Sequence, residues 1–190
     1  GHNFTILPVP QHLEGLSSVK KQRYTKLHPD EALSENVTGK KYDYTIYIDG
    51  SLRITCDIKP LVYSLMASGK SIAIHNHCLR SCIYDEAQML WIFDKLDMKS
   101  IKEQIGFYHE ERMPEHFGLP ETPVLIRKSN DPQLQDIMHQ WWLQIERFTH
   151  RDQLSLPYVL WKNGLDMSYI FSLGNNVWQN PYFLHYKHNT

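Results

Sequence analysis

The chain has 190 residues and a mass of 22.5 kDa, a length that predicts one domain, residues 1–190, with its own hydrophobic core. Its 20 Lys and Arg residues nearly balance 21 Asp and Glu residues, which disfavours general binding to nucleic acid or to an anionic membrane. No apolar run approaches the roughly 20 residues that span a bilayer, so we expect no transmembrane segment.

The cysteine content indicates a reducing environment. Cys56, Cys78 and Cys82 cannot all pair within one chain, and a chain of this length does not need disulfides to fold. We therefore predict free thiols and a cytoplasmic location. The sequence begins at Gly1 without an initiator methionine, which suggests a trimmed or excised chain.

The first half of the chain alternates strand and helix signals. Five segments are expected to be regular: a strand at 4–9, a helix at 16–28, and strands at 42–48, 52–56 and 71–74. His28-Pro29 ends the helix, because the residue before a proline is disfavoured in the helical region. The run at 42–48 is rich in β-branched and aromatic residues and stops at the turn signal Asp49-Gly50.

The second half adds the helices that should cover the sheet. We expect helices from about residue 84 and at 98–111, 132–148 and 155–162, and a strand at 124–126. Asp131 can cap the helix at 132–148, Pro132 suits its first position, and Trp141 falls within its apolar stripe as a core residue. Helices interleaved with strands predict an α/β domain with a mixed, mostly parallel central sheet.

The first candidate site is Asp49-Gly50-Ser51, which follows the clearest strand. Ligands of open α/β sheets bind beyond the carboxyl ends of strands, and a carboxylate there suits a divalent cation that also grips a diphosphate. The alternative is a plain hairpin turn without a ligand, because Asp-Gly is a strong hairpin signal.

The second candidate site joins a strand to a helix, from His75 to Glu86. Arg80 and the helix N-terminus could cradle a phosphate there. His75, His77, Cys78 and Cys82 are all possible zinc ligands, but their spacing departs from standard knuckles. A His-rich capping loop with core thiols is the simpler interpretation.

The third candidate site is Arg151-Asp152-Gln153, placed between two helices. If its surroundings are buried, Asp152 becomes a candidate general base toward a substrate hydroxyl, although adjacent Arg and Asp residues usually form a weak surface pair. In the tail, His185 or His188 could complete a metal site, because imidazole is an acceptable Mn²⁺ ligand, or either could simply be exposed to solvent.

Several motifs in order resemble the domain-of-unknown-function 616 glycosyltransferase-like family, over roughly residues 20–162. The motifs are Arg23-x-x-Lys26-x-x-Pro29, Tyr44-x-Ile46-Tyr47-Ile48-Asp49-Gly50-Ser51, His77-x-x-Arg80-x-Cys82-x-Tyr84-x-Glu86-Ala87, Gln104 with Tyr108, Gly118-Leu119 with Arg127, Trp141-Trp142, and Arg151-Asp152-Gln153-Leu154-Ser155-x-x-Tyr158-Val159-Leu160. The resemblance implies a GT-A-type α/β/α domain. It also implies transfer of a hexose-type sugar from a nucleotide-diphosphate sugar to a hydroxyl of a glycan or glycoprotein, with Mn²⁺ or Mg²⁺.

The resemblance also implies roles for individual residues. Asp49 would stand in the Asp-x-Asp region that holds metal and diphosphate, although Ser51 replaces the second acid, and His188 or else His185 would complete the metal shell. Asp152 would be the catalytic base. The residues implied to bind donor or acceptor are Arg23, Lys26, Asp49, Gly50, Ser51, His77, Arg80, Glu86, Arg151 and Gln153.

Two other functions stay open at the level of sequence. The first nucleotide-binding strand of such domains has no counterpart here, and the Asp-x-Asp region is incomplete, so a binding module for carbohydrate or nucleotide without catalysis is one alternative. A metal-dependent hydrolase built around His75, His77 and Asp49 is the other.

Overall fold

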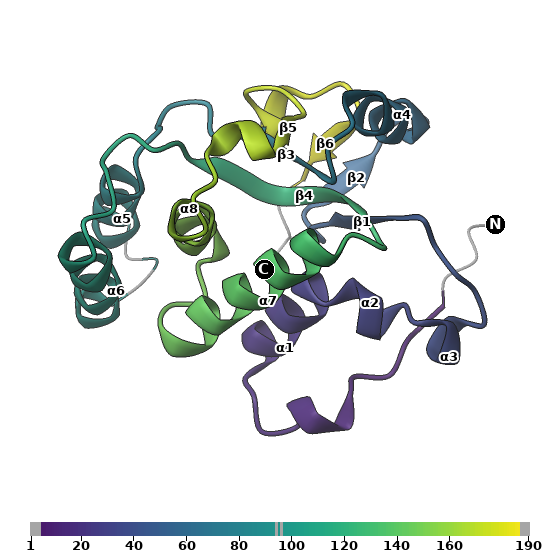
Figure 1. Ribbon diagram of the computed structural model, residues 1–190, viewed down its shortest axis with the longest axis horizontal. Helices are drawn as coiled ribbons and strands as arrows, with labels where there is room; N and C mark the ends of the chain where they lie inside the picture. The colour runs from purple at the N-terminus through teal and green to yellow at the C-terminus, as the bar shows by residue number, and fades with distance from the viewer. Residues whose placement is uncertain (1–4, 94, 96, 187–190) are drawn as a thin grey trace.

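The computed structural model describes residues 5–93, 95 and 97–186. Figure 1 shows a central sheet with helices on both of its faces. On one face lie α1 (Ser18–Leu27), α7 (Pro132–Arg147) and α8 (Asp152–Lys162), and on the other lies α4 (Lys59–Ser68). The expected α/β class, with a mixed sheet between helices, is therefore confirmed.

The central sheet has four strands in the order β1-β4-β3-β5. Their bounds are β1 (Tyr44–Ile48), β3 (Ile72–Asn76), β4 (Pro120–Lys128) and β5 (Phe171–Ser172). β4 runs antiparallel to both of its neighbours, and β3 pairs with β5 in parallel. Three strands thus share one direction, but two of the three hydrogen-bonded pairs are antiparallel, so the sheet is mixed as expected and its pairing is not mostly parallel.

The short strand after Asp49 does not return along β1. β2 (Leu52–Ile54) pairs instead with β6 (Phe183–His185) in a separate antiparallel sheet. A turn at Asp49 redirects the chain, and the N–H of Leu52 donates to the carbonyl of Asp49 at 2.9 Å. The hairpin interpretation of Asp49-Gly50 is therefore wrong, because the segment joins two sheets.

Each face of the sheet has its own core. Ile72, Ile74 and Leu125 face the larger core, which α1, α7, α8, α5 (Ile83–Ile92) and α6 (Met98–Glu110) cover. Ala73 and Val124 face the smaller core under α4 and the β2–β6 sheet. This split follows from the alternation of side chains along each strand.

Helix α7 forms as the sequence predicts. Asp131 accepts a hydrogen bond from the N–H of Leu134 at 2.9 Å, and Pro132 occupies the first turn. Trp141 is fully buried, and its indole N–H donates to the carbonyl of Asp152 at 2.8 Å. This helix therefore fixes the start of α8 as well as filling the core.

Three expectations about local structure are wrong. Residues 5–9 form no strand, and the first four residues lie outside the described part of the chain. α8 begins at Asp152 rather than at 155, so Asp152 occupies a first helical turn and not a linker. The sequence patterns also missed α4 and the short elements α2 (Pro29–Ala32), α3 (Glu35–Thr38), η1 (Gln11–Leu13), η2 (Met167–Tyr169) and η3 (Val177–Gln179).

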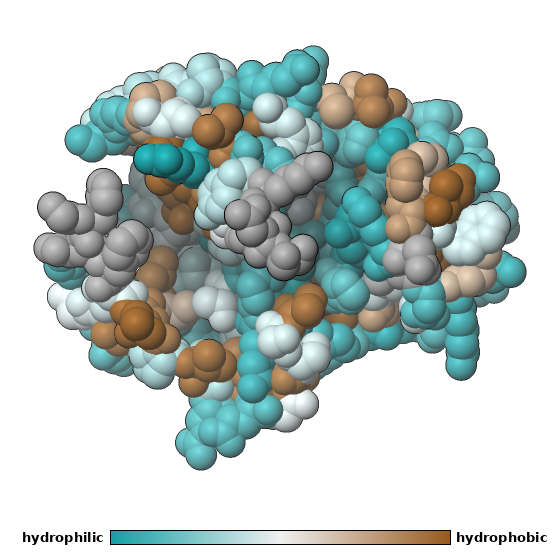
Figure 2. All heavy atoms as spheres, turned by 180° about the vertical axis from the view of Figure 1, so that it is seen from behind, coloured by the Kyte–Doolittle hydropathy of each residue, from teal (hydrophilic) through white to brown (hydrophobic). Residues whose placement is uncertain are grey.

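The described helices include none that is long and apolar enough to cross a membrane. On the face drawn in Figure 2, hydrophobic residues form small groups among hydrophilic ones. Cys56 and Cys78 are exposed and Cys82 is buried, and all three are free thiols, as predicted.

Candidate functional site

The carboxyl ends of β1 and β3 meet at one edge of the sheet, with the start of β4 between them. The backbone N–H of Asp49, one residue past β1, donates to the carbonyl of Pro123 at 2.8 Å. The backbone N–H of His77, one residue past β3, donates to the carbonyl of Leu119 at 2.8 Å. Two of the predicted sites therefore flank the same strand, where open α/β sheets commonly bind ligands.

The Asp49 turn is held on both sides. The hydroxyl of Tyr47 donates to the Asp49 carboxylate and accepts from the side-chain amide of Gln22. From the far end of the chain, the Tyr186 hydroxyl donates to the carbonyl of Gly50 at 3.0 Å, and the Tyr186 N–H donates to the carbonyl of Ser51 at 3.1 Å. The partly exposed carboxylate of Asp49 is thus presented from a fixed backbone.

The tail passes close to this turn, as the resemblance implies for a metal-completing histidine. His185 pairs with Leu52 across the β2–β6 ladder, and its ring lies edge-on to Trp178 with centroids 4.6 Å apart. His188 lies outside the described residues. Metal ligation by either histidine stays a prediction.

Behind Asp49 lies a buried ionic group, here called the inner cluster: Arg23, Lys26 and Asp152. The ammonium of Lys26 lies 2.6 Å from Oδ2 of Asp152 and donates to the Thr122 carbonyl at 2.7 Å. The same ammonium lies 4.6 Å from the ring centre of Tyr47, a cation–π contact. Lys26 is 1% exposed, so its charge is satisfied by protein groups rather than by water.

Arg23 is the more accessible cation of the inner cluster. Its Nε lies 3.6 Å from Oδ2 of Asp152, and its side chain is 15% exposed. Nε also donates to the carbonyl of His150 at 3.2 Å, and Nη1 donates to the side-chain oxygen of Gln22 at 2.7 Å. Arg23 therefore connects the buried pair to the surface of the site.

The charges of the inner cluster compensate one another. Burial alone would raise the pKa of Asp152, but the positive charges of Lys26 and Arg23 and the hydrogen bonds from Lys26 and Thr122 outweigh it and lower the pKa overall. Burial lowers the pKa of Lys26, and Asp152 opposes this. Oδ1 of Asp152 accepts from the N–H of Gln153 at 3.0 Å, so both carboxylate oxygens already have donors.

A second ionic group lies beyond β3 and is here called the outer cluster: His77, Arg80, Glu86 and Glu121. Arg80 grips Glu86 through two nitrogens, with Nε and Nη2 lying 2.7 and 2.6 Å from Oε2. Glu86 comes from the first turn of α5 and Glu121 from the second residue of β4. The sequence analysis named the first three members and missed Glu121.

His77 connects the two carboxylates of the outer cluster. Its Nδ1 accepts from the N–H groups of Leu79 and Arg80 at 3.1 and 3.0 Å, and Nη2 of Arg80 lies 3.0 Å from its Nε2, so both ring nitrogens face N–H donors. Nε2 lies 3.8 Å from a carboxylate oxygen of Glu86 and equally far from one of Glu121. Burial, reinforced by Arg80, lowers the pKa of His77 despite Glu86.

Glu121 has the opposite electrostatic character to Asp152. Its Oε2 is buried and has no hydrogen-bond partner among the described residues. Burial raises its pKa above the usual value and Glu86 adds to this, while hydrogen bonds with Val177 and Trp178 and the charge of Arg80 oppose it only in part. The signal available in the sequence was an acid three residues before the apolar run Val124-Leu125-Ile126.

A hollow of about 380 Å³ opens beside the outer cluster and is lined by His77 and Arg80 among others. Gly118 lies in its wall with φ +124°, and a Cβ at this position would collide with Met167. The glycine therefore allows the η2 segment to pack closely against this wall.

Besides the Asp49 turn and the tail, three further predicted residues lie outside both clusters. Arg151 precedes α8, and its Nε is buried without a partner among the described residues, while Gln153 is half-buried in the first turn. His75 is fully buried, with Nε2 2.8 Å from the Asn180 amide and its ring against Phe183 of the smaller core. His75 also lies across the β3–β4 ladder from Glu121, and the hydrolase centre built around it stays a prediction.

The oxygen chemistry of the Asp49 turn fits a hard cation. Mg²⁺ and similar ions are held by one or two carboxylates, with substrate phosphates and water as the remaining ligands. A single partly exposed carboxylate meets this requirement when a diphosphate supplies the other oxygens. Among the described residues, a different group, His77, Cys78 and Glu121, brings three ligand atoms within 4.8 Å of one another.

The fold and this edge define an α/β protein that gathers charged side chains where its strands end. Residues 39–188 match the TOD1/MUCI70 glycosyltransferase-like domain, so the chain belongs to this family. It is 30% identical over 125 residues, 61% of this chain, to a probable hexosyltransferase MUCI70 of Arabidopsis thaliana, and it spans only 21% of that relative. No solved structure matches the chain.

The family confirms the glycosyltransferase-like resemblance seen in the motifs. The matched range begins after α1, so it covers Asp49, the outer cluster and Asp152 but not Arg23 or Lys26. The domain-of-unknown-function 616 label, the GT-A type and the cytoplasmic location stay predictions.

Proposed function

We propose that this chain transfers a hexose-type sugar from a nucleotide-diphosphate sugar to a hydroxyl of a sugar or glycan acceptor, with Mn²⁺ or Mg²⁺ at Asp49. The observation that carries the proposal is the meeting of Asp49, the inner cluster and the outer cluster at one edge of the sheet. Membership of a glycosyltransferase-like family and the name of the hexosyltransferase relative support the reaction class.

The donor diphosphate is assigned to the side of Asp49. When bound, the cation would offset the negative charge of the leaving diphosphate. Arg23 is the cation of the inner cluster best placed to face the same group, because it is the more exposed of the two. Lys26 is already bonded on all sides, and we assign it to holding Asp152, α1 and β4 in place.

The proton of the acceptor hydroxyl is assigned to Glu121 rather than to Asp152. A general base needs a free lone pair and a pKa near the working pH. Both oxygens of Asp152 have donors and its pKa is lowered, whereas Glu121 has an oxygen without a partner and a raised pKa. Glu121 does not itself line the neighbouring hollow, but His77 does, and its Nε2 lies 3.8 Å from a carboxylate oxygen of Glu121, so we assign the acceptor to that hollow.

A panel of uridine- and guanosine-diphosphate hexoses, with and without MnCl₂, tests the donor assignment. A ligand that binds only the native state raises the melting temperature. We expect a Mn²⁺-dependent rise with one donor, followed by release of nucleoside diphosphate when an acceptor glycan is added.

Asp49→Asn should lower turnover by about 100-fold or more while the protein stays folded. The matched control is Asp43→Asn, an exposed acid before the other end of β1, which should keep the wild-type rate. Equal rates in the Asp49 variant and the control would refute the metal and diphosphate assignment. A donor-dependent melting shift without any turnover would instead support a binding module.

The base assignment is tested by comparing Glu121→Gln with Asp152→Asn. If Glu121 is the base, its variant should lose turnover by about 100-fold or more and keep donor binding. Full turnover in Glu121→Gln together with a collapse in Asp152→Asn would return the role to Asp152.

A further inference from the structure

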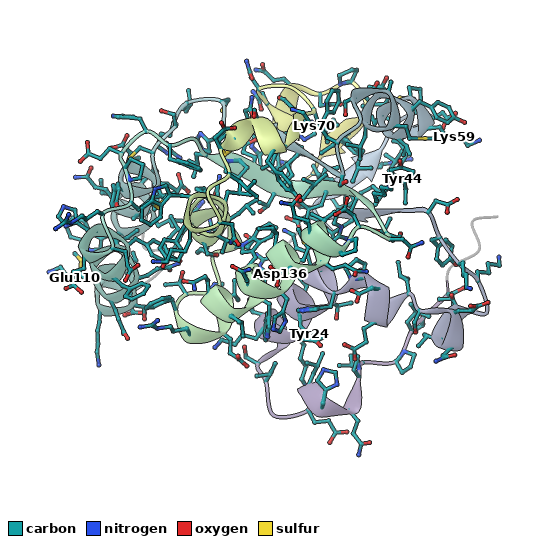
Figure 3. All side chains as sticks on the ribbon, viewed as in Figure 1. Tyr24, Tyr44, Lys59, Lys70, Glu110 and Asp136 are labelled. Atoms are coloured by element: carbon teal, nitrogen blue, oxygen red, sulfur yellow. The ribbon has the colours of Figure 1, made fainter. Side chains whose placement is uncertain are left out.

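A second hollow lies at the opposite end of the sheet, where β1 begins and β4 ends. It has a volume of about 240 Å³ and lies between α1–α3, the sheet and the start of α7. Tyr44, the first residue of β1, is labelled in Figure 3 and pairs with Lys128 in the wall of this hollow. The last residue of β1, Ile48, pairs with Val124 and leads to Asp49, so the length of β1 separates this hollow from Asp49.

Arg127 in the wall of this hollow is a buried cation without a counter-ion. Its residue is 3% exposed, and it forms no salt bridge with any described residue. Nη1 donates to the carbonyl of Lys26, whereas Nε is buried and has no partner in the described part of the chain. Removing a guanidinium from water without a paired anion is costly, so this position needs a compensating group.

The electrostatics agree with this geometry. Burial lowers the pKa of Arg127 to about 10, and the negative charge of Asp30 and the neighbouring Tyr47 only partly oppose it. A guanidinium with a close carboxylate would have its charged form favoured instead.

Two further polar atoms at this hollow are also unsatisfied. Thr45 lies directly across the β1–β4 ladder from Arg127, and its hydroxyl is buried without a partner, as is the hydroxyl of Ser129. Buried polar groups in native proteins are nearly always hydrogen-bonded. Three such atoms around one hollow point to polar groups supplied by a ligand.

We propose that this hollow binds the carboxylate of a small organic acid with an apolar body, with Arg127 as the anchor and Thr45 and Ser129 as further hydrogen-bond partners. The planar guanidinium suits a carboxylate because two parallel N–H groups can meet its two oxygens. Leu27, Leu134 and Met138 provide apolar walls for the body of the ligand. The site is independent of the sugar-transfer proposal, because it shares no side chain with either cluster.

Benzoate and benzamide form a matched pair of probes, since they have the same ring and differ in charge. Sodium benzoate, benzamide and inorganic phosphate are titrated into the full chain and followed by amide chemical shifts. We expect benzoate alone to move the amides of Thr45, Arg127 and Ser129. Arg127→Met should weaken benzoate binding by about tenfold or more, whereas Arg53→Met, an exposed arginine on β2, should leave it unchanged.

Thr45→Val keeps the shape of the side chain, so it serves if Arg127→Met does not fold. It should weaken benzoate binding severalfold, because a hydrogen bond to the carboxylate is lost. Equal binding of benzoate and benzamide, shifts caused equally by phosphate, or shifts outside these residues would overturn the proposal. So would undiminished benzoate binding in a folded Arg127→Met protein. These results leave the Asp49 experiments unaffected.

Discussion

The two ionic clusters at this edge of the sheet are built from the same kinds of side chain. They differ in how fully nearby cations balance the charge of each carboxylate. In the inner cluster two cations surround one buried carboxylate, and the pKa of Asp152 is lowered as a result. In the outer cluster one arginine is committed to Glu86, and the pKa of Glu121 is raised.

This difference is the basis on which we propose a structural role for Asp152 and a chemical role for Glu121. A fully paired carboxylate is a weak base but fixes the elements that carry its partners, here α1, β4 and α8. An underpaired carboxylate costs stability and keeps a lone pair available for substrate. Proteins that bind and transform ligands commonly place such groups at their sites.

The largest expected effect comes from opening the inner cluster. Lys26→Met leaves Asp152 buried without its closest partner and should lower the free energy of unfolding by about 3–5 kcal/mol, measured by urea denaturation. Adding Asp152→Leu should recover much of this loss, because no unpaired charge then stays buried. Lys21→Met on the same helix is the control and should change stability little. A loss below about 1 kcal/mol in Lys26→Met would contradict the inference that buried Asp152 depends on Lys26 to balance its charge.

A smaller effect, of opposite sign in the two clusters, should appear with pH. The lowered pKa of Asp152 contributes stability that is present above its unfolded value of about 3.8 and is lost as the pH falls through the native value. The raised pKa of Glu121 contributes stability that is present below about 4.5 and is lost as the pH rises through the native value. At pH 7, Asp152→Asn should therefore destabilise the protein, and Glu121→Gln should leave it unchanged or more stable.

Urea denaturation of both variants between pH 3.5 and about pH 7 checks this pair of signs. The difference for Glu121→Gln should shrink toward about pH 3.5, where Glu121 is protonated in both states. The difference for Asp152→Asn should shrink only as the pH falls below about 3.8 toward the lowered native pKa of Asp152. Destabilisation of similar size at pH 7 in both variants would show that the two carboxylates are equally well paired.

The smallest effect is expected at the hydrogen bonds in front of the inner cluster. Tyr47→Phe removes a hydroxyl that bonds Gln22 and Asp49 but keeps the ring over Lys26, so stability should fall by about 0.5–1.5 kcal/mol. Tyr44→Phe on the same strand is the control. A loss of stability above about 3 kcal/mol in thermal or urea unfolding would mean that the Tyr47 hydroxyl is as important to stability as the buried ion pairs of the inner cluster.

Much of the fold could be predicted because residues close together in the sequence determine most of the helices and strands. The apolar stripe and Asp131 cap predicted α7, and β-branched and aromatic residues predicted β1. The pairing of β2 with β6 could not be predicted, since both strands are short and join distant parts of the chain. Arg151-Asp152 was predicted to lie in a linker because the first turn of α8 is polar. The apolar residues that indicate a helix come only after it.

The site was predictable where a polar residue follows a strand, as at Asp49 and His77. Glu121 was missed because it lies at the start of β4 rather than after a strand, and only the antiparallel direction of β4 brings it to the same edge. Lys26 was predicted to face the donor, but it is buried against Thr122 and Asp152. The sequence shows the charge of a lysine and cannot show which groups already surround it.

The contact of Tyr186 with Gly50 has a consequence for the order of folding. The hydrogen bond joins residues 136 positions apart, so the turn beside Asp49 acquires its full set of contacts only when the two ends of the domain meet. Contacts of such sequence separation close late, after local helices and adjacent strands, because the entropy of a long loop must be overcome first. We therefore expect the Asp49 carboxylate to reach its native environment late in folding.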